Sequence, residues 1–410
     1  MEPRAIPEMA VLHLERLCSE IGERPVGSPG NIRATEYFRM VVSGFGWDVE
    51  SHPLAVLGWK PGEAGLTCGD AALDVSPSPY APGCDVSARL LPVSTVGELA
   101  ECSMKESIIL LHGEIASGQL MPKNFQFYNP PEHGRIIALL ENGMPAAIIS
   151  ATGRNPSLAG GVYPFPLIED GDFDIPSVFT TAEIGRELAA LSGREVRLWS
   201  SSERIPSTAW NVLARKGSPS GGRIVVTAHI DAKNGTPGAI DNATGVTVLL
   251  LLAELLADST GTPTVELVAL NGEDHYSAAG QMDYIQRHMG APEKILLNIN
   301  IDGAGYREGE TSFSFFDLPE DLESAARSVM ASFPGIREGA PWPQGDHSIF
   351  VQYGRPAIAV SSTWFLENMD TQDITHTPKD RLDIVDPSRV VVIAEALADL
   401  VRRLSPVQLV

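Results

Sequence analysis

The stretch "TAHIDAKNGTPGAIDNATG", Thr227 to Gly245, directly follows the β-forming run "GRIVV". It places His229, Asp231, Asp241 and Asn242 where a buried strand should give way to a turn. Open α/β sheets gather their ligands outside the carboxyl ends of their strands. The stretch therefore predicts a functional site at one edge of such a sheet.

From Trp210 onward, apolar strand-like runs alternate with longer segments of helical periodicity. The expected strands are 223–230, 264–271, 294–302 and 355–362, and the expected helices are 242–258, 277–289, 321–333 and 387–404. Near-continuous apolar strands that alternate with helices are typical of parallel sheets covered on both faces. We therefore predict an α/β fold in which a mostly parallel mixed sheet is sandwiched by helices.

The first half of the chain predicts a second, smaller α/β domain. Helices are expected at 8–22 and 31–46 and a strand at 47–54, before a passage rich in Pro and Gly. The following region has its own strand signals at 107–113, 134–140 and 146–150, a helix signal at 181–191, and an apparent exit linker at 200–208. We predict one domain made of residues 1–54 and 205–410, split by an inserted domain of residues 55–204.

Composition excludes several classes of function. The 410-residue chain has 43% hydrophobic residues and a formal net charge of −22. This charge repels phosphate backbones and anionic membranes, so neither nucleic acid nor membrane is an expected partner. The longest apolar run, Val246 to Ala257, is too short to span a bilayer and predicts a buried helix. No secretory signal is evident and the four cysteines form no C-x-x-C pair, which favours a cytoplasmic protein.

Every strand of the second half is followed by side chains that bind metals. They are His229, Asp231 and Asp241 after the first strand, Glu273, Asp274 and His275 after the second, Asp302 after the third, and His376 in the loop beyond the fourth. Imidazole and carboxylate groups suit zinc. Acids from separate strand ends would repel one another without a cation, and a carboxylate that bridges two ions holds them about 3.5–4 Å apart. The pattern favours a metal pair.

Each of these residues has a simpler interpretation when taken alone. Asp241 could cap the helix that follows it, and Glu273 and Asp274 could be favoured by a helix dipole. Asp302 precedes a glycine and fits an ordinary turn. The coincidence of five ligand-capable groups at one sheet edge favours the metal site.

The ordered motifs resemble those of a known family. They are "AHIDAKNGTPGAIDNATG", "NGEDHYSAAG", "LNINIDGAG", "QGDHSIFVQYGRPAI" and "THTPKD", preceded near the N-terminus by "GERPVGSPGNIRATEYF". Together they resemble the co-catalytic dinuclear zinc aminopeptidases, a family that also contains glutamate carboxypeptidase and the glutaminyl cyclases. The resemblance covers the N-terminal helices and nearly everything after Trp210, and it implies a zinc exopeptidase-like fold. The inserted region resembles a protease-associated domain.

The resemblance implies a role for each motif residue. His229 and Asp302 would bind one zinc, Asp274 and His376 the other, and Asp241 would bridge both. Asp231 would orient the His229 imidazole. Glu273 would be the general base, which takes a proton from a water bound by the two zinc ions and delivers it to the leaving amine.

Two departures from the family pattern concern the substrate side. Members commonly have Glu where Asp274 stands, and some use a tyrosine at the positions of Thr375 or Trp342 to stabilise the oxyanion. The oxyanion donor is therefore open. His347 is a candidate oxyanion or substrate contact, and a structural hydrogen bond is the alternative for this residue.

The resemblance implies a metal-dependent exopeptidase, in the first place an aminopeptidase that acts on peptides with two zinc ions; cobalt and manganese also suit such ligands. A carboxypeptidase is an alternative because Arg307, Arg355 and Lys379 lie near the motifs. A single-zinc glutaminyl cyclase and an inactive binding homologue are the others, although no expected ligand is missing. A homo-oligomer stays open, and the insertion would be a lid that limits substrate size, a spacer or an oligomer contact.

Overall fold

The computed structural model describes residues 5–154, 162–218, 221–259, 263–369 and 371–404. Its internal contacts divide the chain into two compact units. Unit 1 comprises residues 1–56 and 208–410, and unit 2 comprises residues 57–207. The predicted boundaries, after residue 54 and before residue 205, lie close to this division.

Unit 1 is built on a mixed sheet. Within the described residues it has eight strands in the order β1-β10-β12-β11-β13-β16-β14-β15. Their bounds are β1 (Asp48–Lys60), β10 (Glu203–Lys216), β11 (Arg223–His229), β12 (Thr264–Leu270), β13 (Ile295–Ile301), β14 (Thr311–Phe316), β15 (Ile336–Glu338) and β16 (Ala357–Ser362). The central strands β12, β11, β13 and β16 are parallel, whereas β10 and β14 pair antiparallel to β12 and β16. The predicted mostly parallel mixed sheet is confirmed.

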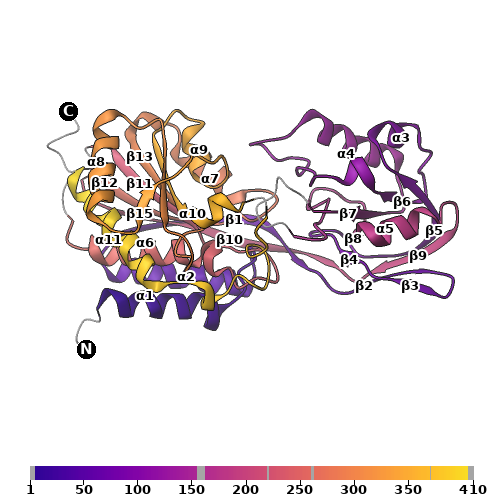
Figure 1. The fold of residues 1–410 in the computed structure, drawn as a ribbon, viewed down its shortest axis with the longest axis horizontal. Coiled ribbons are helices and arrows are strands. Elements are labelled where there is room, and N and C mark those ends of the chain that lie inside the picture. Colours follow the sequence, from indigo (N-terminus) through magenta and orange to yellow (C-terminus); the bar gives the residue numbers. More distant parts are fainter. Residues whose placement is uncertain (1–4, 155–161, 219–220, 260–262, 370, 405–410) are drawn as a thin grey trace. The chain divides into compact units, whose positions relative to one another are not determined.

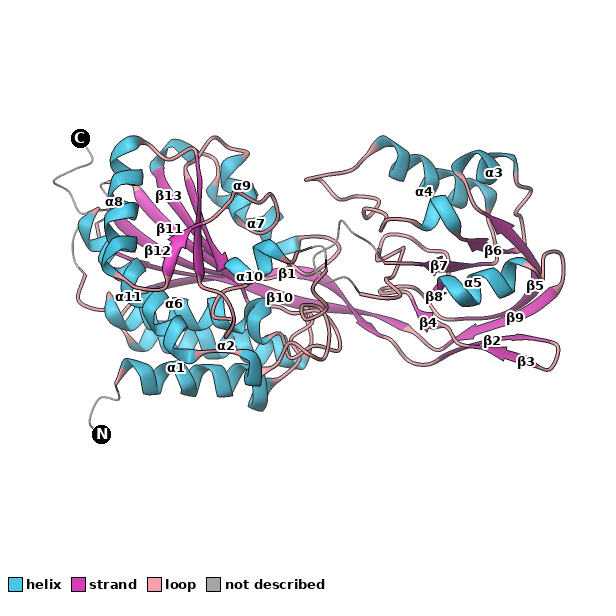
Figure 2. Cartoon of the chain, viewed as in Figure 1, coloured by secondary structure: helices cyan, strands magenta, loops and turns pink. Residues whose placement is uncertain are grey.

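Helices cover both faces of this sheet (Figures 1 and 2). One face is covered by α1 (Ile6–Glu15), α2 (Pro29–Gly44), α6 (Thr244–Leu255), α8 (Glu320–Ser332) and α11 (Pro387–Arg403), which share one hydrophobic core with the strands. The other face holds α7 (Ala279–His288) and α9 (His347–Val351), which meet through the rings of Tyr284 and Phe350. The shorter elements of unit 1 are η1 (Arg16–Ile21), η3 (Ala239–Ala243), η4 (Pro292–Lys294), η5 (Leu382–Ile384) and α10 (Thr363–Glu367).

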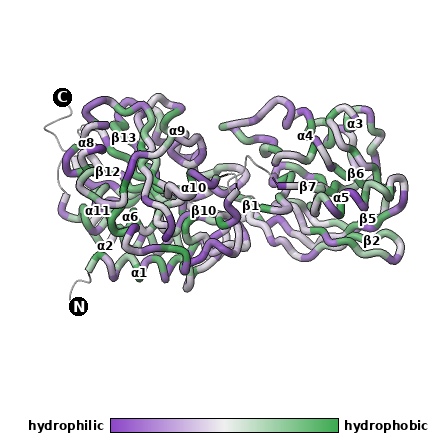
Figure 3. Tube along the Cα trace, viewed as in Figure 1, coloured by the Kyte–Doolittle hydropathy of each residue, from purple (hydrophilic) through white to green (hydrophobic). Residues whose placement is uncertain are grey.

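Helix α6 is the buried helix that the apolar run predicted. Residues 244–253 are all buried, because the sheet, α1, α2 and α11 surround this helix. Figure 3 colours much of this core as hydrophobic.

The parallel strands bring their carboxyl ends to one edge of the sheet. His229, the last residue of β11, pairs with Leu270, the last residue of β12. On the other side of β11, Thr227 pairs with Asn300, so β13 ends at the same level. The segments that follow these strands therefore start side by side, as the sequence predicts.

Unit 2 has a mixed sheet of its own. In the described part of the chain its order is β3-β2-β9-β5-β6-β7-β8-β4. The bounds are β2 (Ala64–Cys68), β3 (Ala71–Leu73), β4 (Ser76–Pro77), β5 (Cys84–Val93), β6 (Ile108–Leu111), β7 (Ala147–Thr152), β8 (Ser177–Thr181) and β9 (Glu195–Ser200). Helices α3 (Val96–Glu101) and α4 (Pro131–Gly143) contribute to one hydrophobic core, and α5 (Ala182–Ala189) contributes to another; the 3-10 turn η2 is Gly113–Ala116.

Two local predictions for this region differ from the structure. Residues 134–140, predicted as a strand, lie inside helix α4, which starts at Pro131. A short apolar run does not distinguish a buried strand from a buried helix face, whereas Pro in the first turn favours a helix start. Residues 200–208, predicted as the exit linker, do contain the boundary between the two units, but Glu203 onward is the strand β10 rather than a linker.

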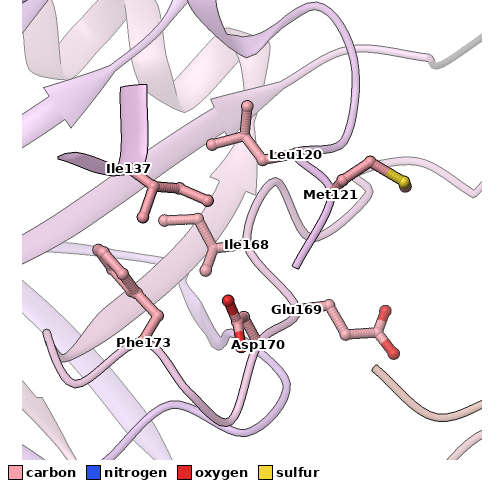
Figure 4. Close-up of a pocket in the computed structure, with 7 residues that line it drawn as sticks. All are labelled: Leu120, Met121, Ile137, Ile168, Glu169, Asp170 and Phe173. Atoms are coloured by element: carbon pink, nitrogen blue, oxygen red, sulfur yellow. The ribbon is translucent and has the colours of Figure 1, made fainter. Parts of the chain in front are cut away.

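Unit 2 contains a small cavity, shown in Figure 4. Leu120, Ile137, Ile168 and Phe173 line it together with the acidic Asp170. Its volume is about 10 Å³, which is close to the space that one water molecule needs. The cavity is too small for a peptide side chain, so it offers no substrate site.

A charged network ties β1 to the centre of the unit 1 sheet and gives a first prediction. Arg215 on β10 pairs with both Glu50 and the buried Glu266. Burial opposes the charge of Glu50, but hydrogen bonds from Arg215 and His52 prevail and lower its pKa to about 2.

Glu50→Gln is expected to lower the melting temperature at pH 7 by about 2–4 °C. Because the pKa of Glu50 is lower in the folded protein than in the unfolded chain, its stabilisation is present above about pH 4.5 and disappears as the pH falls toward 2. The difference between parent and variant should therefore shrink between pH 5 and pH 3 in thermal unfolding. Glu36→Gln, which removes an exposed ion pair with Arg39, is the control. If the melting temperature of Glu50→Gln stayed below that of the parent by the same amount at every pH, the lowered pKa of Glu50 would not be the cause.

Candidate metal centre

One group of ligand atoms gathers where β11 and β13 end. The His229 Nε2 atom lies 3.0 Å from Asp241 Oδ1 and 3.7 Å from Asp302 Oδ1. His229 ends β11, Asp302 follows β13, and Asp241 lies in η3 just before helix α6. Three segments thus supply one imidazole and two carboxylates to a common point.

A second group shares Asp241 with the first. The His376 Nε2 atom lies 3.1 Å from Asp241 Oδ2 and 3.0 Å from Asp274 Oδ1. The two oxygens of Asp241 therefore face different histidines, Oδ1 toward His229 and Oδ2 toward His376. The five residues predicted as ligands are brought together in the arrangement expected of a bridging carboxylate.

The distances between these atoms fit the spacing of ligands around a metal ion. Tetrahedral zinc with bonds of about 2.0–2.2 Å separates neighbouring ligand atoms by roughly 3.3–3.6 Å. The observed separations of 3.0–3.7 Å are close to this range. Neither ring nitrogen of the buried His229 makes a hydrogen bond with any described residue, and the same holds for Asp274 Oδ2. Atoms that approach one another without hydrogen-bond geometry fit ligands arranged around a cation.

The electrostatics of the site also favour a cation. Burial disfavours a charged His229, but the surrounding Asp231, Asp241 and Asp302 raise its pKa well above the ordinary value. Burial likewise disfavours a charged His376, yet Asp274 and Asp241 raise its pKa well above the ordinary value. The carboxylates therefore favour positive charge at both points, which a divalent ion would supply.

Asp231 connects two strand ends. Its Oδ1 accepts a 2.7 Å hydrogen bond from the Gly272 amide, and its Oδ2 accepts a 3.0 Å bond from the Asp274 amide. Asp231 was also predicted to orient the His229 imidazole. Its Oδ1 lies 3.8 Å from His229 Nδ1, which is too far for a direct hydrogen bond. Asp231 thus holds the backbone of Asp274, a predicted ligand, through a hydrogen bond, and its negative charge favours a protonated His229.

Glu273 lies in the loop after β12, next to Asp274. Gly272 adopts φ +112°, a conformation that favours glycine, and turns the chain just before this carboxyl group. Burial, together with the negative charges of Asp274 and Asp302, raises the Glu273 pKa well above its ordinary value. A carboxyl group that holds a proton more strongly than usual is suited to general acid–base chemistry near neutral pH.

His347 makes the structural hydrogen bond that the sequence left as an alternative. Its Nε2 lies 2.9 Å from the Trp342 carbonyl oxygen, so Nε2 donates the proton. Burial lowers the His347 pKa to about 4, and the neutral ring then leaves Nδ1 unprotonated. A nitrogen without a proton does not donate to an oxyanion, so this geometry gives His347 no oxyanion role. Thr375, which stands at the other position where some family members have a tyrosine, accepts a 2.6 Å hydrogen bond from the Gln372 side chain.

Two buried groups behind the predicted ligands were not predicted from the sequence. Asp380, in the "THTPKD" motif, accepts hydrogen bonds of 2.7 Å and 3.0 Å from the amides of Ile240 and Asp241. Arg24, in the N-terminal "GERPVGSPG" motif, is fully buried and donates to the carbonyl of Ile230, between His229 and Asp231. Both residues lie within motifs that carry the family resemblance, and this position was the signal in the sequence that could have identified them.

A buried amide network supports the loop that contains Glu273. Asn271 and Asn31 exchange side-chain hydrogen bonds of 2.9 Å and 3.1 Å, and the Asn271 amide donates to Asn211 Oδ1 at 2.9 Å. All three asparagines are buried. Helix α2, the strand β10 and the loop after β12 are thereby joined next to the site.

The segment that contains this site resembles a known peptidase family. Residues 211–401 match Peptidase family M28. The matched segment includes every predicted metal ligand and Glu273. The predicted enzyme class, a zinc-dependent metallopeptidase, is confirmed. The match does not extend to unit 2, whose protease-associated character stays a prediction.

Proteins similar to this chain include named peptidases and one different enzyme. The "Probable lipoprotein aminopeptidase LpqL" of Mycobacterium tuberculosis is 24% identical over 287 residues, which cover 68% of this chain and 55% of that relative. An aminopeptidase structure from Aneurinibacillus sp. strain AM-1 has a TM-score of 0.76 at 20% identity and covers 98% of this chain and 95% of that one. A glutaminyl cyclase structure from Porphyromonas gingivalis has a TM-score of 0.54 at 13% identity, covering 97% and 98%. The two structures show the shared fold.

Among the described residues, no helix combines the length and apolar character needed to cross a bilayer. All four cysteines are free thiols.

Proposed function

We propose that this protein is an aminopeptidase that uses two zinc ions to release N-terminal residues from peptides. The observation that supports this most strongly is the bridging position of Asp241, whose two oxygens face two separate histidines. His229, Asp241 and Asp302 would hold one ion, and Asp241, Asp274 and His376 the other. Cobalt and manganese also suit this set of ligands.

The proposed mechanism assigns one task to each part of the site. When bound, the metal ions would polarise the scissile carbonyl and lower the pKa of water. Glu273 then accepts a proton from the attacking water and returns it to the leaving amine. Asp231 and Asp380 hold the backbone of Asp274 and Asp241 in place through amide hydrogen bonds.

The alternatives have weaker support from the described residues. The three basic groups that favoured a carboxypeptidase have other partners. Lys379 pairs with Asp373, and Arg307 donates to the Asp383 carbonyl. Arg355 donates to the carbonyl of Ile295 at the start of β13, whereas the predicted metal ligands lie where the strands end. A complete set of ligands for two ions argues against a single-zinc cyclase. The retained base and ligands argue against an inactive binding homologue.

Metal removal provides the direct test. Treatment with a chelator is expected to abolish hydrolysis of peptides with a free N-terminus, and added zinc should restore it at two ions per chain by elemental analysis. Substrates blocked at the N-terminus should resist cleavage, because an aminopeptidase requires the free amine. Cleavage of blocked peptides from their C-terminus would support the carboxypeptidase instead. Full activity with one ion, and cyclisation of N-terminal glutamine, would support the cyclase.

We further propose that unit 2 is a protease-associated-like domain that limits substrate size. A chain that lacks residues 61–202 should cleave long and short peptides at more similar rates than the parent. Unchanged selectivity would leave the spacer or oligomer contact. Free cysteines agree with the predicted cytoplasmic location, which fractionation of cells would test.

A further inference from the structure

Arg24 is a fully buried cation whose side chain donates hydrogen bonds to backbone carbonyl groups. Its exposed fraction is 0%, and its guanidinium donates to five carbonyl oxygens. These belong to Leu17, Gly22, Ile230, Pro237 and Gly238, at distances between 2.7 and 3.3 Å. Burying a charge is expensive unless every donor is satisfied, so this position is specific for arginine.

The five carbonyls come from three segments that meet behind the ligands. Leu17 and Gly22 lie at the end of the N-terminal helix, and Ile230 lies between the residues His229 and Asp231. Pro237 and Gly238 precede η3, which contains Asp241. One guanidinium therefore joins the end of β11 to the loop that presents the bridging carboxylate.

Further contacts hold the same loop. The backbone carbonyl of Arg24 accepts a 3.3 Å hydrogen bond from the Ala232 amide. Gly238 has φ +59°, and a Cβ atom there would lie 2.9 Å from Arg24 Nη2 and 2.5 Å from the Ala232 side chain. The loop thus approaches the guanidinium as closely as glycine permits.

Arg24 also contributes charge to the region. Burial lowers its pKa, while Asp380, Asp231 and Asp241 are among the groups whose negative charge favours its cation. Asp380 in turn binds the amides of Ile240 and Asp241. The acids around the ligands are therefore placed beside one permanent cation that belongs to the protein.

We propose that Arg24 is a positioning residue of the metal centre, which holds the Asp241 loop against the end of β11 so that the ligands are preorganised for both ions. The inference rests on the proposed function for the identity of those ions. Arg24 touches neither substrate nor ligand side chains in this role; it acts through the backbone that presents them.

The test compares zinc affinity in Arg24→Lys, Arg24→Met and Arg355→Lys. Arg355 is the matched control, because it also donates to a backbone carbonyl of unit 1 but at the opposite end of β13. Competition with a zinc-sensitive dye is expected to show affinity about 10–100-fold lower in both Arg24 variants, with peptidase activity of Arg24→Lys partly restored by excess zinc. Arg355→Lys should keep the parent's zinc affinity even where its melting temperature falls.

Parent-like zinc affinity in the Arg24 variants, with only a lower melting temperature of the metal-free protein, would overturn the proposal and leave Arg24 as a purely structural group. If neither Arg24 variant folds, Asp380→Asn tests the same scaffold, because it keeps one acceptor oxygen and loses the second. The same drop in zinc affinity supports the proposal, and unchanged affinity overturns it. A parent that binds zinc but cleaves no peptide would refute the proposed function alone, whereas a parent that binds no metal would refute both.

Discussion

Replacing Glu273 by glutamine is expected to lower kcat for peptide hydrolysis by about 10³-fold, which corresponds to about 4 kcal/mol, because general bases contribute roughly 10²–10⁴-fold. Glutamine preserves the shape of the side chain but accepts no proton. Since Glu273 is not among the predicted ligands, the variant should keep the parent's zinc content and melting temperature. Rates on an N-terminally free peptide, measured together with zinc content, check this expectation.

The matched control is Glu254→Gln. Burial also raises the pKa of Glu254, but this carboxyl lies in the last turn of α6, whose first turn adjoins the site. Its replacement should leave kcat unchanged. If Glu273→Gln hydrolysed peptides as fast as the parent, the general-base assignment would be wrong. Equal losses in both variants would point to a general effect of removing a half-buried acid.

The edge of the sheet was predictable because its causes are local. Apolar runs identify β11, β12, β13 and β16, and parallel strands must end at a common edge. Polar residues that follow those runs are therefore neighbours in space, whatever the intervening loops do. Asp241, Asp274 and Asp302 were therefore predicted to lie near one another without any knowledge of the loop conformations.

Other parts were not predictable because they depend on tertiary contacts. The antiparallel β10 starts in a segment with Pro206 and several serines, which resembles a linker when judged by composition. Arg24 stands between Glu23 and Pro25 in a turn-rich segment, where an arginine is most often exposed. Only the folded chain shows that five carbonyls from three segments surround it. The His347 ring was ambiguous for the same reason, since its partner is a backbone carbonyl.

The dual role of Asp241 gives the second large effect. Asp241→Ala is expected to reduce peptide hydrolysis below detection and to remove most of the stabilisation by zinc, because both histidines lose their shared carboxylate. Ligand binding at about 1,000 times Kd stabilises a protein by roughly 4 kcal/mol. The parent should therefore melt at a higher temperature with zinc than with chelator, and this difference should largely vanish in the variant.

Asp170→Ala separates this effect from the general cost of losing a buried aspartate. Asp170 lies in unit 2 and, like Asp231, accepts hydrogen bonds from two backbone amides, those of Lys123 and Asp172. Its loss should lower the melting temperature of the metal-free protein but leave the zinc-dependent increase intact. Because Asp241 faces one histidine with each oxygen, its removal should instead impair binding of both ions together. A variant that kept one tightly bound zinc and the full zinc-dependent increase would contradict the bridging assignment and leave Asp241 as a ligand of a single ion.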